Sequence, residues 1–207
     1  MSHRHTIIIA CVEGYSASSR KSEENISYTL AEMMAPTINK DKSHNRIVTK
    51  IFNSAAPAVQ RHARDFVIDE IKKCASSYSV YFIGKSMGGA KLYYIIKKLM
   101  KKHNDILRYA KEVRVAFIDA HGNPWFDFDS IRPFGKYHSI KIPNKWYRKV
   151  PRLSIYGAYQ HQHFPRGAKI YNAEYCIEIT TPTDHFKMIK HPLVKSVLSL
   201  NYLACRV

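Results

Sequence analysis

The 207-residue chain is 45% hydrophobic and carries a formal net charge of +17. This length and apolar content fit one globular domain with a sizeable core, and they exclude a disordered chain. No apolar run reaches the roughly 18–20 residues of a membrane span. The positive charge predicts either attraction to polyanions, such as anionic membrane surfaces or nucleic acid, or a solvated basic surface with incidental affinity.

The N-terminal apolar run, residues 6–10, is short and is not followed by a small-residue cleavage site. We therefore interpret it as a first strand and not as a signal peptide, and we expect a cytoplasmic protein. The four cysteines are widely separated and form no Cys-x-x-Cys pair, which argues against a metal cluster and against a disulfide framework.

Strand and helix patterns alternate along the chain. Apolar or β-branched runs predict strands at residues 6–12, 46–52, 80–83, 112–118, 152–157 and 175–179. Apolar residues at helical spacing predict helices from Ser22 to Pro36 and at 58–75, 89–103 and 192–203. Residues 123–149 are predicted to form an irregular insert, rich in aromatic and basic residues. The whole chain, 1–207, is predicted to be a single α/β domain.

This alternation predicts a compact, mostly parallel sheet with helices on both faces. In such sheets the chemically active groups gather beyond the carboxyl ends of the strands. Glu13-Gly14, Ser86, Asp119 and His185 each lie just past the end of a predicted strand. We therefore expect these residues at one edge of the sheet.

The segment Gly84-Lys85-Ser86-Met87-Gly88 has the Gly-x-Ser-x-Gly spacing of a nucleophile elbow. A serine held at a sharp strand-to-helix turn needs small neighbours two residues away on either side, because the two backbones almost touch. Gly84-Lys85-Ser86 also matches the end of a phosphate-binding P-loop. That motif requires a further glycine where this chain has Ser79, so the elbow is the better interpretation.

A serine hydroxyl needs a base within hydrogen-bonding reach, and the base needs an orienting group. His185 is the preferred base, because it follows a strand, lies in a loop and precedes the last helix; His161, His163 and His191 are the alternatives. Asp119 is the preferred acid, because it ends a strongly apolar strand; Asp127, Asp129 and Asp184 are the alternatives.

Acyl transfer also needs N–H donors for the oxyanion that develops on the substrate. The backbone N–H of Met87 follows the candidate nucleophile and is one expected donor. The second is expected from the loop after the first strand, at Tyr15 or Ser16 beside Gly14. The alternative for this loop is an ordinary strand-to-helix turn.

The chain resembles the serine esterases and lipases of the α/β-hydrolase fold. The resemblance rests on Gly84–Gly89, on Ile118-Asp119 and on Thr183-Asp184-His185-Phe186, and it covers nearly the whole chain in element order. It implies hydrolysis of an ester, thioester or amide through an acyl-serine, without a cofactor. The acid comes one strand earlier than in the commonest pattern, as in some lipases of the fold, and the chain is short.

The insert at 123–149 is expected to lie over the active-site end as a lid. Its aromatic residues suit an acyl pocket, a membrane contact, stacking on single-stranded nucleic acid, or plain packing on the sheet; the pocket candidates are Trp125, Phe126, Phe128 and Phe134.

The favoured function is a serine hydrolase acting on a small-molecule or lipid-like carboxylic ester. The alternatives are a thioesterase, amidase or acyltransferase with the same triad, and a non-catalytic domain that binds nucleic acid or another polyanion. An anionic membrane surface is the favoured polyanionic partner, ahead of nucleic acid.

Overall fold

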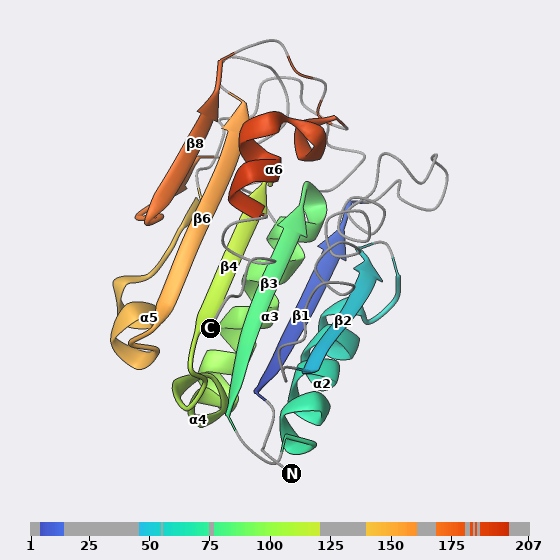
Figure 1. Cartoon of the computed structure of the whole chain (residues 1–207), viewed down its shortest axis with the longest axis vertical. Helices are drawn as coiled ribbons and strands as arrows, with labels where there is room; N and C mark the ends of the chain where they lie inside the picture. Colours follow the sequence, from blue (N-terminus) through green and yellow to red (C-terminus); the bar gives the residue numbers. More distant parts are fainter. Residues whose placement is uncertain are drawn as a thin grey trace.

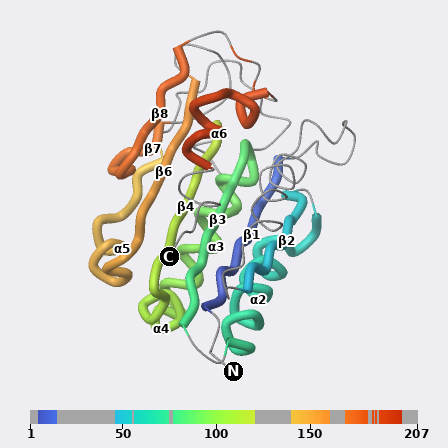
Figure 2. The backbone as a smooth tube through the Cα atoms, in the orientation of Figure 1, coloured from blue at the N-terminus to red at the C-terminus, as the bar shows by residue number. Residues whose placement is uncertain are grey.

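The computed structural model describes residues 5–14, 46–54, 56–74, 77–120, 140–160, 169–180, 183, 185 and 187–198. Six strands form one sheet in the order β2-β1-β3-β4-β6-β8, and each neighbouring pair in it is parallel. Their bounds are β1 (Thr6–Glu13), β2 (Arg46–Asn53), β3 (Tyr78–Lys85), β4 (Val113–Ile118), β6 (Leu153–Gln160) and β8 (Tyr175–Ile179). Figure 2 shows the strands side by side, with β2 at one edge of the sheet and β8 at the other.

Helices cover both faces of this sheet, so the predicted α/β fold class is confirmed (Figure 1). One face carries α2 (Val59–Lys72), α3 (Met87–Lys102), α4 (Asn104–Arg108) and α5 (Asn144–Lys149), whose apolar sides join one core cluster. The 3₁₀ helix η4 (Met188–Lys190) and α6 (Pro192–Leu198) pack on the other face, in a second cluster. No helix in the described ranges is long and apolar enough to cross a membrane.

The central strands are mostly apolar because both of their faces are covered, and their polar residues lie near the strand ends. Every residue of β1 is buried, as are all but the first residue of β3. Continuous β-branched runs of this kind are typical of parallel strands between two helical layers. Alternate residues of β1 serve the two cores: Ile8 and Ala10 face α2 and α3, whereas Ile9 and Cys11 face η4 and α6.

The predicted strands are confirmed within a few residues at their ends, and β6 extends to Gln160. Helix α3 begins at Met87, two residues before the expected start, because the helix follows the elbow turn without a linker. The described part of the last helix ends at Leu198. The helix expected from Ser22 to Pro36 lies outside the described residues.

The prediction of an irregular segment is wrong for residues 140–149. Two-residue strands β5 (Ile140–Lys141) and β7 (Ile170–Tyr171) pair in a second, parallel sheet, and α5 follows β5. Trp146 of α5 is buried with its ring centroid 5.2 Å from that of Tyr93 in α3. This part of the predicted lid therefore packs on α3 as core, while residues 121–139 lie outside the described residues.

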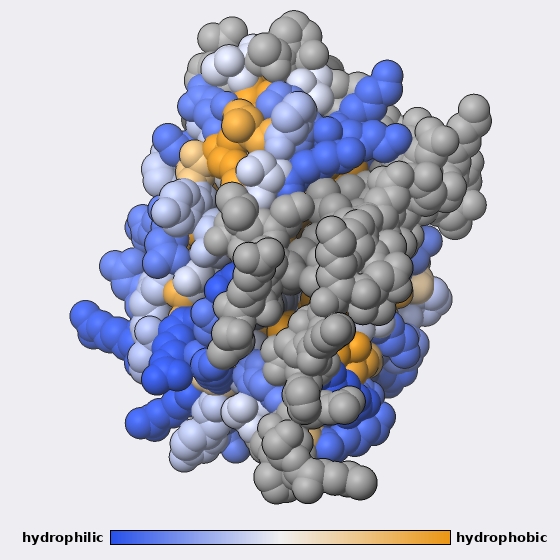
Figure 3. All heavy atoms as spheres, viewed as in Figure 1, coloured by the Kyte–Doolittle hydropathy of each residue, from blue (hydrophilic) through white to orange (hydrophobic). Residues whose placement is uncertain are grey.

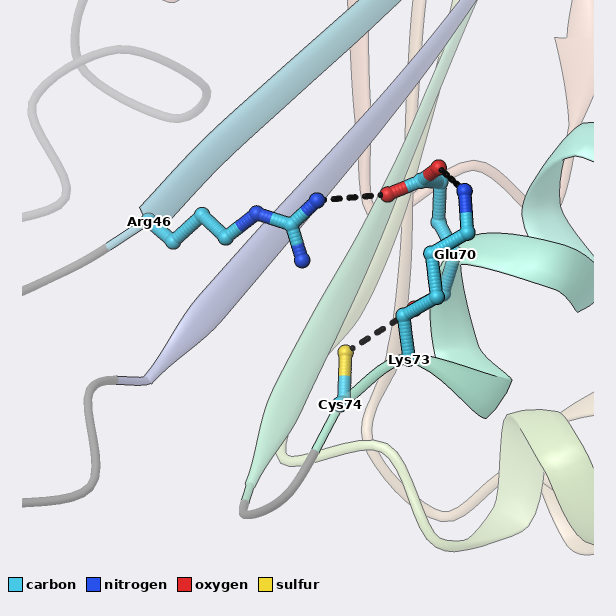
Figure 4. Close-up of polar contacts among 4 residues, drawn as sticks. All are labelled: Arg46, Glu70, Lys73 and Cys74. Atoms are coloured by element: carbon cyan, nitrogen blue, oxygen red, sulfur yellow. Dashed lines mark hydrogen bonds and ion pairs between the residues drawn. The ribbon is translucent and has the colours of Figure 1, made fainter.

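A buried carboxylate ties α2 to the start of β2 (Figure 4). Glu70, with only 9% of its side chain exposed, accepts hydrogen bonds from Arg46 Nη2 at 3.0 Å and from Lys73 Nζ at 2.6 Å. Both cations are largely exposed and keep much of their hydration. The pairs therefore avoid the full desolvation cost of a buried ion pair while they satisfy Glu70.

We expect Glu70→Gln to lower the free energy of unfolding by about 1–2 kcal/mol, because the amide has one accepting oxygen: one of the two bonds is lost, and the other is made to an uncharged acceptor. Urea denaturation measures the change. Asp69→Asn, at the exposed neighbouring position, is the matched control and is expected to change stability by less than about 0.5 kcal/mol. Equal effects of the two substitutions would show that the Glu70 pairs contribute nothing specific.

Candidate active site

The turn between β3 and α3 holds Ser86 in a strained backbone conformation. Ser86 has φ 54° and ψ −130°, and α3 starts at the next residue. Non-glycine residues rarely adopt this region, and such strain is characteristic of functional turns. A hydrogen bond ties the turn to the end of β4, because the Ser86 N–H donates to the Ile118 carbonyl at 3.0 Å. Ser86 is therefore fixed at the carboxyl end of the central strand.

The glycines of the elbow are required by close backbone contacts. A Cβ on Gly88 would lie 2.0 Å from the Val12 carbonyl oxygen, and one on Gly84 would lie 2.7 Å from the Gly89 Cα. A Cβ on Gly89 would lie 2.3 Å from the Cβ of Ala120. The start of α3 thus touches β1, β3 and the residue after Asp119, and any side chain would separate them.

The structure brings Ser86, His185 and Asp119 together at this edge. The Ser86 Oγ lies 2.8 Å from Nε2 of His185, and Nδ1 of the same ring is hydrogen-bonded to Oδ2 of Asp119. An ionised carboxylate can only accept, so the ring proton lies on Nδ1, and Nε2 is left to accept from the serine hydroxyl. This is the tautomer that a serine nucleophile requires of its base.

Asp119 is locked in place behind the histidine. Its side chain is completely buried, its φ is 44°, and its N–H donates to the Ala158 carbonyl at 2.7 Å. Within the described ranges its Oδ1 has no hydrogen-bond partner. Oδ2 is thus the carboxylate oxygen that holds the imidazole, and the backbone on both sides fixes its direction.

The described alternative among the histidines has another role. Nδ1 of His191 accepts a hydrogen bond from the Leu193 N–H at 3.3 Å, at the start of α6. This agrees with the structural capping role that its position before Pro192 suggests. The other candidates, His161, His163, Asp127, Asp129 and Asp184, lie outside the described residues.

The P-loop alternative is wrong. The segment that would form the phosphate cradle is strand β3, and its buried Ser79 is hydrogen-bonded to the ring of His5 at 3.0 Å. An extended strand does not turn its N–H groups toward one anion, as a phosphate-binding loop must.

Two residues of the expected oxyanion-binding site, Met87 and Gly14, lie within the described ranges. Met87 is the first residue of α3, and the first N–H groups of a helix have no partner within it. A Cβ on Gly14 would lie 3.2 Å from the Ser86 Cβ and 3.5 Å from its Oγ, so a side chain at this position would crowd the hydroxyl. Tyr15 and Ser16 lie outside the described residues, as do the pocket candidates Trp125, Phe126, Phe128 and Phe134.

Sequence reasoning placed Glu13 at this edge without giving it a role, and it did not single out Lys85 or Gln160. These three residues end β1, β3 and β6, and each is at most 7% exposed. Their position at strand ends was the available signal. Burial, and then the charge of Glu13, raise the pKa of the Cys11 thiol, so this cysteine stays protonated near neutral pH and is no rival nucleophile.

The residues that the structure describes include no group of three His, Cys, Asp or Glu side chains placed to hold a metal ion. The hydrogen-bonded series at this edge, in the described ranges, joins one hydroxyl, one imidazole and one carboxylate.

Comparisons with known proteins identify the fold. No protein-family model and no curated protein sequence matches the chain. A crystal structure described as "the putative cell surface hydrolase from Lactobacillus plantarum WCFS1" matches with a TM-score of 0.55 at 14% identity, over 100% of this chain and 94% of that one. ClbQ from the colibactin NRPS/PKS pathway matches with a TM-score of 0.42 at 12% identity, over 96% and 98% of the two chains. The fold assignment rests on the first match: this chain has an α/β-hydrolase-like fold.

We expect Gly88→Ala to abolish folding or to lower the free energy of unfolding by at least about 3 kcal/mol, because the added Cβ meets the β1 backbone. Soluble yield and urea denaturation measure this. Gly157→Ala is the comparison, since its Cβ would meet the Ile170 side chain at 2.9 Å, where a rotation can relieve the contact. A smaller loss for Gly88→Ala than for Gly157→Ala would contradict the close approach.

The strain at Ser86 makes a separate prediction. Ser86→Gly and Ser86→Ala both remove the hydroxyl, but only glycine adopts this φ without strain. The glycine variant is therefore expected to be the more stable by about 1 kcal/mol, after its greater entropy in the unfolded chain is subtracted. Parallel denaturation curves decide this; an alanine variant of equal or greater stability would show a relaxed turn.

Proposed function

We propose that this protein is a serine hydrolase that cleaves a carboxylic ester through an acyl-serine intermediate. The observation that supports this most strongly is the hydrogen-bonded series Ser86–His185–Asp119 at the carboxyl edge of an α/β-hydrolase-like sheet. Ser86, Asp119 and His185 follow β3, β4 and β8, and the series requires one tautomer of the His185 ring.

In the first half-reaction, the Ser86 Oγ attacks the ester carbonyl carbon while Nε2 of His185 takes the hydroxyl proton. The tetrahedral intermediate then collapses as the bond to the leaving alkoxide breaks, and Nε2 returns the proton to the departing oxygen. Asp119 stays ionised throughout and stabilises the imidazolium through the Nδ1–H bond.

In the second half-reaction, water takes the place of the alcohol. His185 removes a proton from the water, whose oxygen attacks the acyl carbon, and the same proton is delivered to the Ser86 Oγ as the acid leaves. The sequence is balanced without any redox partner: one ester and one water give one acid and one alcohol.

The negative charge that develops on the carbonyl oxygen needs preorganised donors. The Met87 N–H is the proposed first donor, at the positive end of a 16-residue helix. The second donor is proposed from the loop beyond Gly14, at Tyr15 or Ser16. Because Gly14 has no side chain, we propose that a substrate carbonyl approaches the hydroxyl from that side.

The proposed substrate is a carboxylic ester with a lipid-like acyl group bound near Trp125, Phe126, Phe128 and Phe134. A thioester, an amide, or transfer of the acyl group to an alcohol would use the same three side chains, so these remain the alternatives. They differ in leaving group or acceptor, not in the attack by Ser86.

Hydrolysis of p-nitrophenyl esters of increasing chain length tests the proposal. We expect Ser86→Ala to abolish turnover, and Asp119→Asn to lower kcat about 10³–10⁴-fold, because the amide cannot hold the required tautomer. His191→Ala is the control, since this histidine caps α6 and is expected to keep kcat within about threefold.

Turnover that is unchanged in Ser86→Ala would refute the proposal. A folded wild-type protein without activity on esters, thioesters or amides would favour the non-catalytic alternative, in which the same scaffold binds a polyanion.

A further inference from the structure

The charges on the two long helices of one sheet face differ sharply. Helix α2 has three basic and three acidic residues, and its cations include Arg64, paired with Asp65 at 2.6 Å. Helix α3 has five lysines and no acidic residue. Four of these lysines are exposed on its second half: Lys97, Lys98, Lys101 and Lys102.

The elements next to this half of α3 add more positive charge. Residues 97–112 and 144–152, which include α4 and α5, hold ten basic residues and two acidic ones. One of the two acids, Glu112, is already engaged by Arg114 at 2.9 Å. All ten basic residues are exposed, and we call them the basic face: Lys97, Lys98, Lys101, Lys102, Arg108, Lys111, Lys145, Arg148, Lys149 and Arg152.

Packing holds these elements on one side of the molecule. Leu99 of α3, Leu107 of α4 and Trp146 of α5 belong to the same core cluster, so the basic sides of the three helices face outward together. The Arg152 guanidinium also donates to the Lys111 carbonyl at 3.3 Å, which links the segments after α4 and α5. Figure 3 shows hydrophilic side chains dominating the lower left, where Figure 1 places α4 and α5.

Helix stability explains only part of this charge. Basic residues in the last turn of a helix interact favourably with the negative end of its dipole. This accounts for Lys101 and Lys102 in α3 and for Arg148 and Lys149 in α5. It does not account for Lys97 or Lys98, a turn earlier, or for Lys145 at the start of α5. Because the two segments hold ten basic residues and only two acidic ones, their own carboxylates do not neutralise this surface, and the like charges repel one another.

We propose that the basic face binds an anionic lipid bilayer. Seven of its ten members are lysines, which act as point charges and suit a layer of headgroups, whereas recognition of nucleic acid favours the arginine fork. Tyr109, 75% exposed beside Arg108, adds an aromatic ring of the kind found at the headgroup level of membranes. Binding is peripheral and electrostatic.

This arrangement orients the candidate active site away from the bilayer. Ser86 precedes the first residue of α3, and the four lysines begin about 16 Å farther along the helix axis. His185 and α6 lie at the same end of the sheet as Ser86, opposite α4 (Figure 1). The bound protein therefore holds the edge of the sheet that carries Ser86 apart from the lysines that contact the bilayer.

Cosedimentation of the full chain with vesicles tests the proposal. We expect binding to vesicles that contain about one third phosphatidylglycerol, no binding to pure phosphatidylcholine, and release between about 0.1 M and 0.5 M salt. Replacing Lys97, Lys98, Lys101 and Lys102 by Gln is expected to lower the partition coefficient at least about 30-fold, since each cation near such a surface contributes about fivefold.

The matched control removes the same charge elsewhere, by replacing four exposed residues outside the basic face with Gln: Lys50, Arg61, Lys72 and Lys169. This variant is expected to bind within about fivefold of wild type, and circular dichroism checks that both variants are folded. Equal losses in the two variants would mean that net charge alone drives binding, which would overturn the assignment to this face.

Two further outcomes would overturn the proposal. One is binding to neutral vesicles as strong as to anionic ones. The other is binding to duplex or single-stranded RNA that depends on the four lysines, in a protein that leaves anionic vesicles free; the face would then be a nucleic-acid surface.

The orientation has its own test, which rests on the proposed function. Saturating anionic vesicles are expected to leave hydrolysis of a water-soluble ester within about twofold of its free rate, and strong inhibition would contradict the orientation. Vesicle binding itself needs no activity, and Ser86→Ala is expected to bind vesicles as wild type does.

Discussion

The close approach between the start of α3 and the end of β1 is the constraint on which the candidate site depends. Only a hydrogen atom fits at Gly88 against the Val12 carbonyl, and this contact forces the chain to turn within one residue at Ser86. The strained φ at Ser86 is the local cost of that turn. The buried strands on either side supply the stability that maintains it, because apolar cores cover both faces of β1 and β3.

Much of this arrangement could be predicted from the sequence because the signals were local. Continuous β-branched runs indicated strands buried on both faces, and the Gly-x-Ser-x-Gly spacing located the turn. Asp119 and His185 were found by a topological argument: carboxyl ends of neighbouring parallel strands meet at one edge. The same argument placed Glu13 at this edge, and it could have drawn attention to Lys85 and Gln160, which also end strands and are buried there.

Other features depended on tertiary packing that no local pattern contained. The six-residue helix α5 has one buried residue, Trp146, and it is stabilised by packing against Tyr93 of a helix some fifty residues earlier. The two-residue strands β5 and β7 exist only as each other's partners. Short elements of this kind lack a period long enough to detect, so residues 140–149 looked irregular in the sequence.

The two ends of α3 give the molecule its proposed division of labour. The N-terminus points at Ser86, where the helix dipole favours the charge that develops on a substrate oxygen, and the lysine-rich second half offers positive charge to an anionic surface. Reaction of the folded protein with a fluorophosphonate, followed by mass spectrometry of its peptides, tests the central claim most directly. The account predicts a single adduct on Ser86 that is absent from His185→Ala; an adduct elsewhere, or none in folded protein, would contradict it.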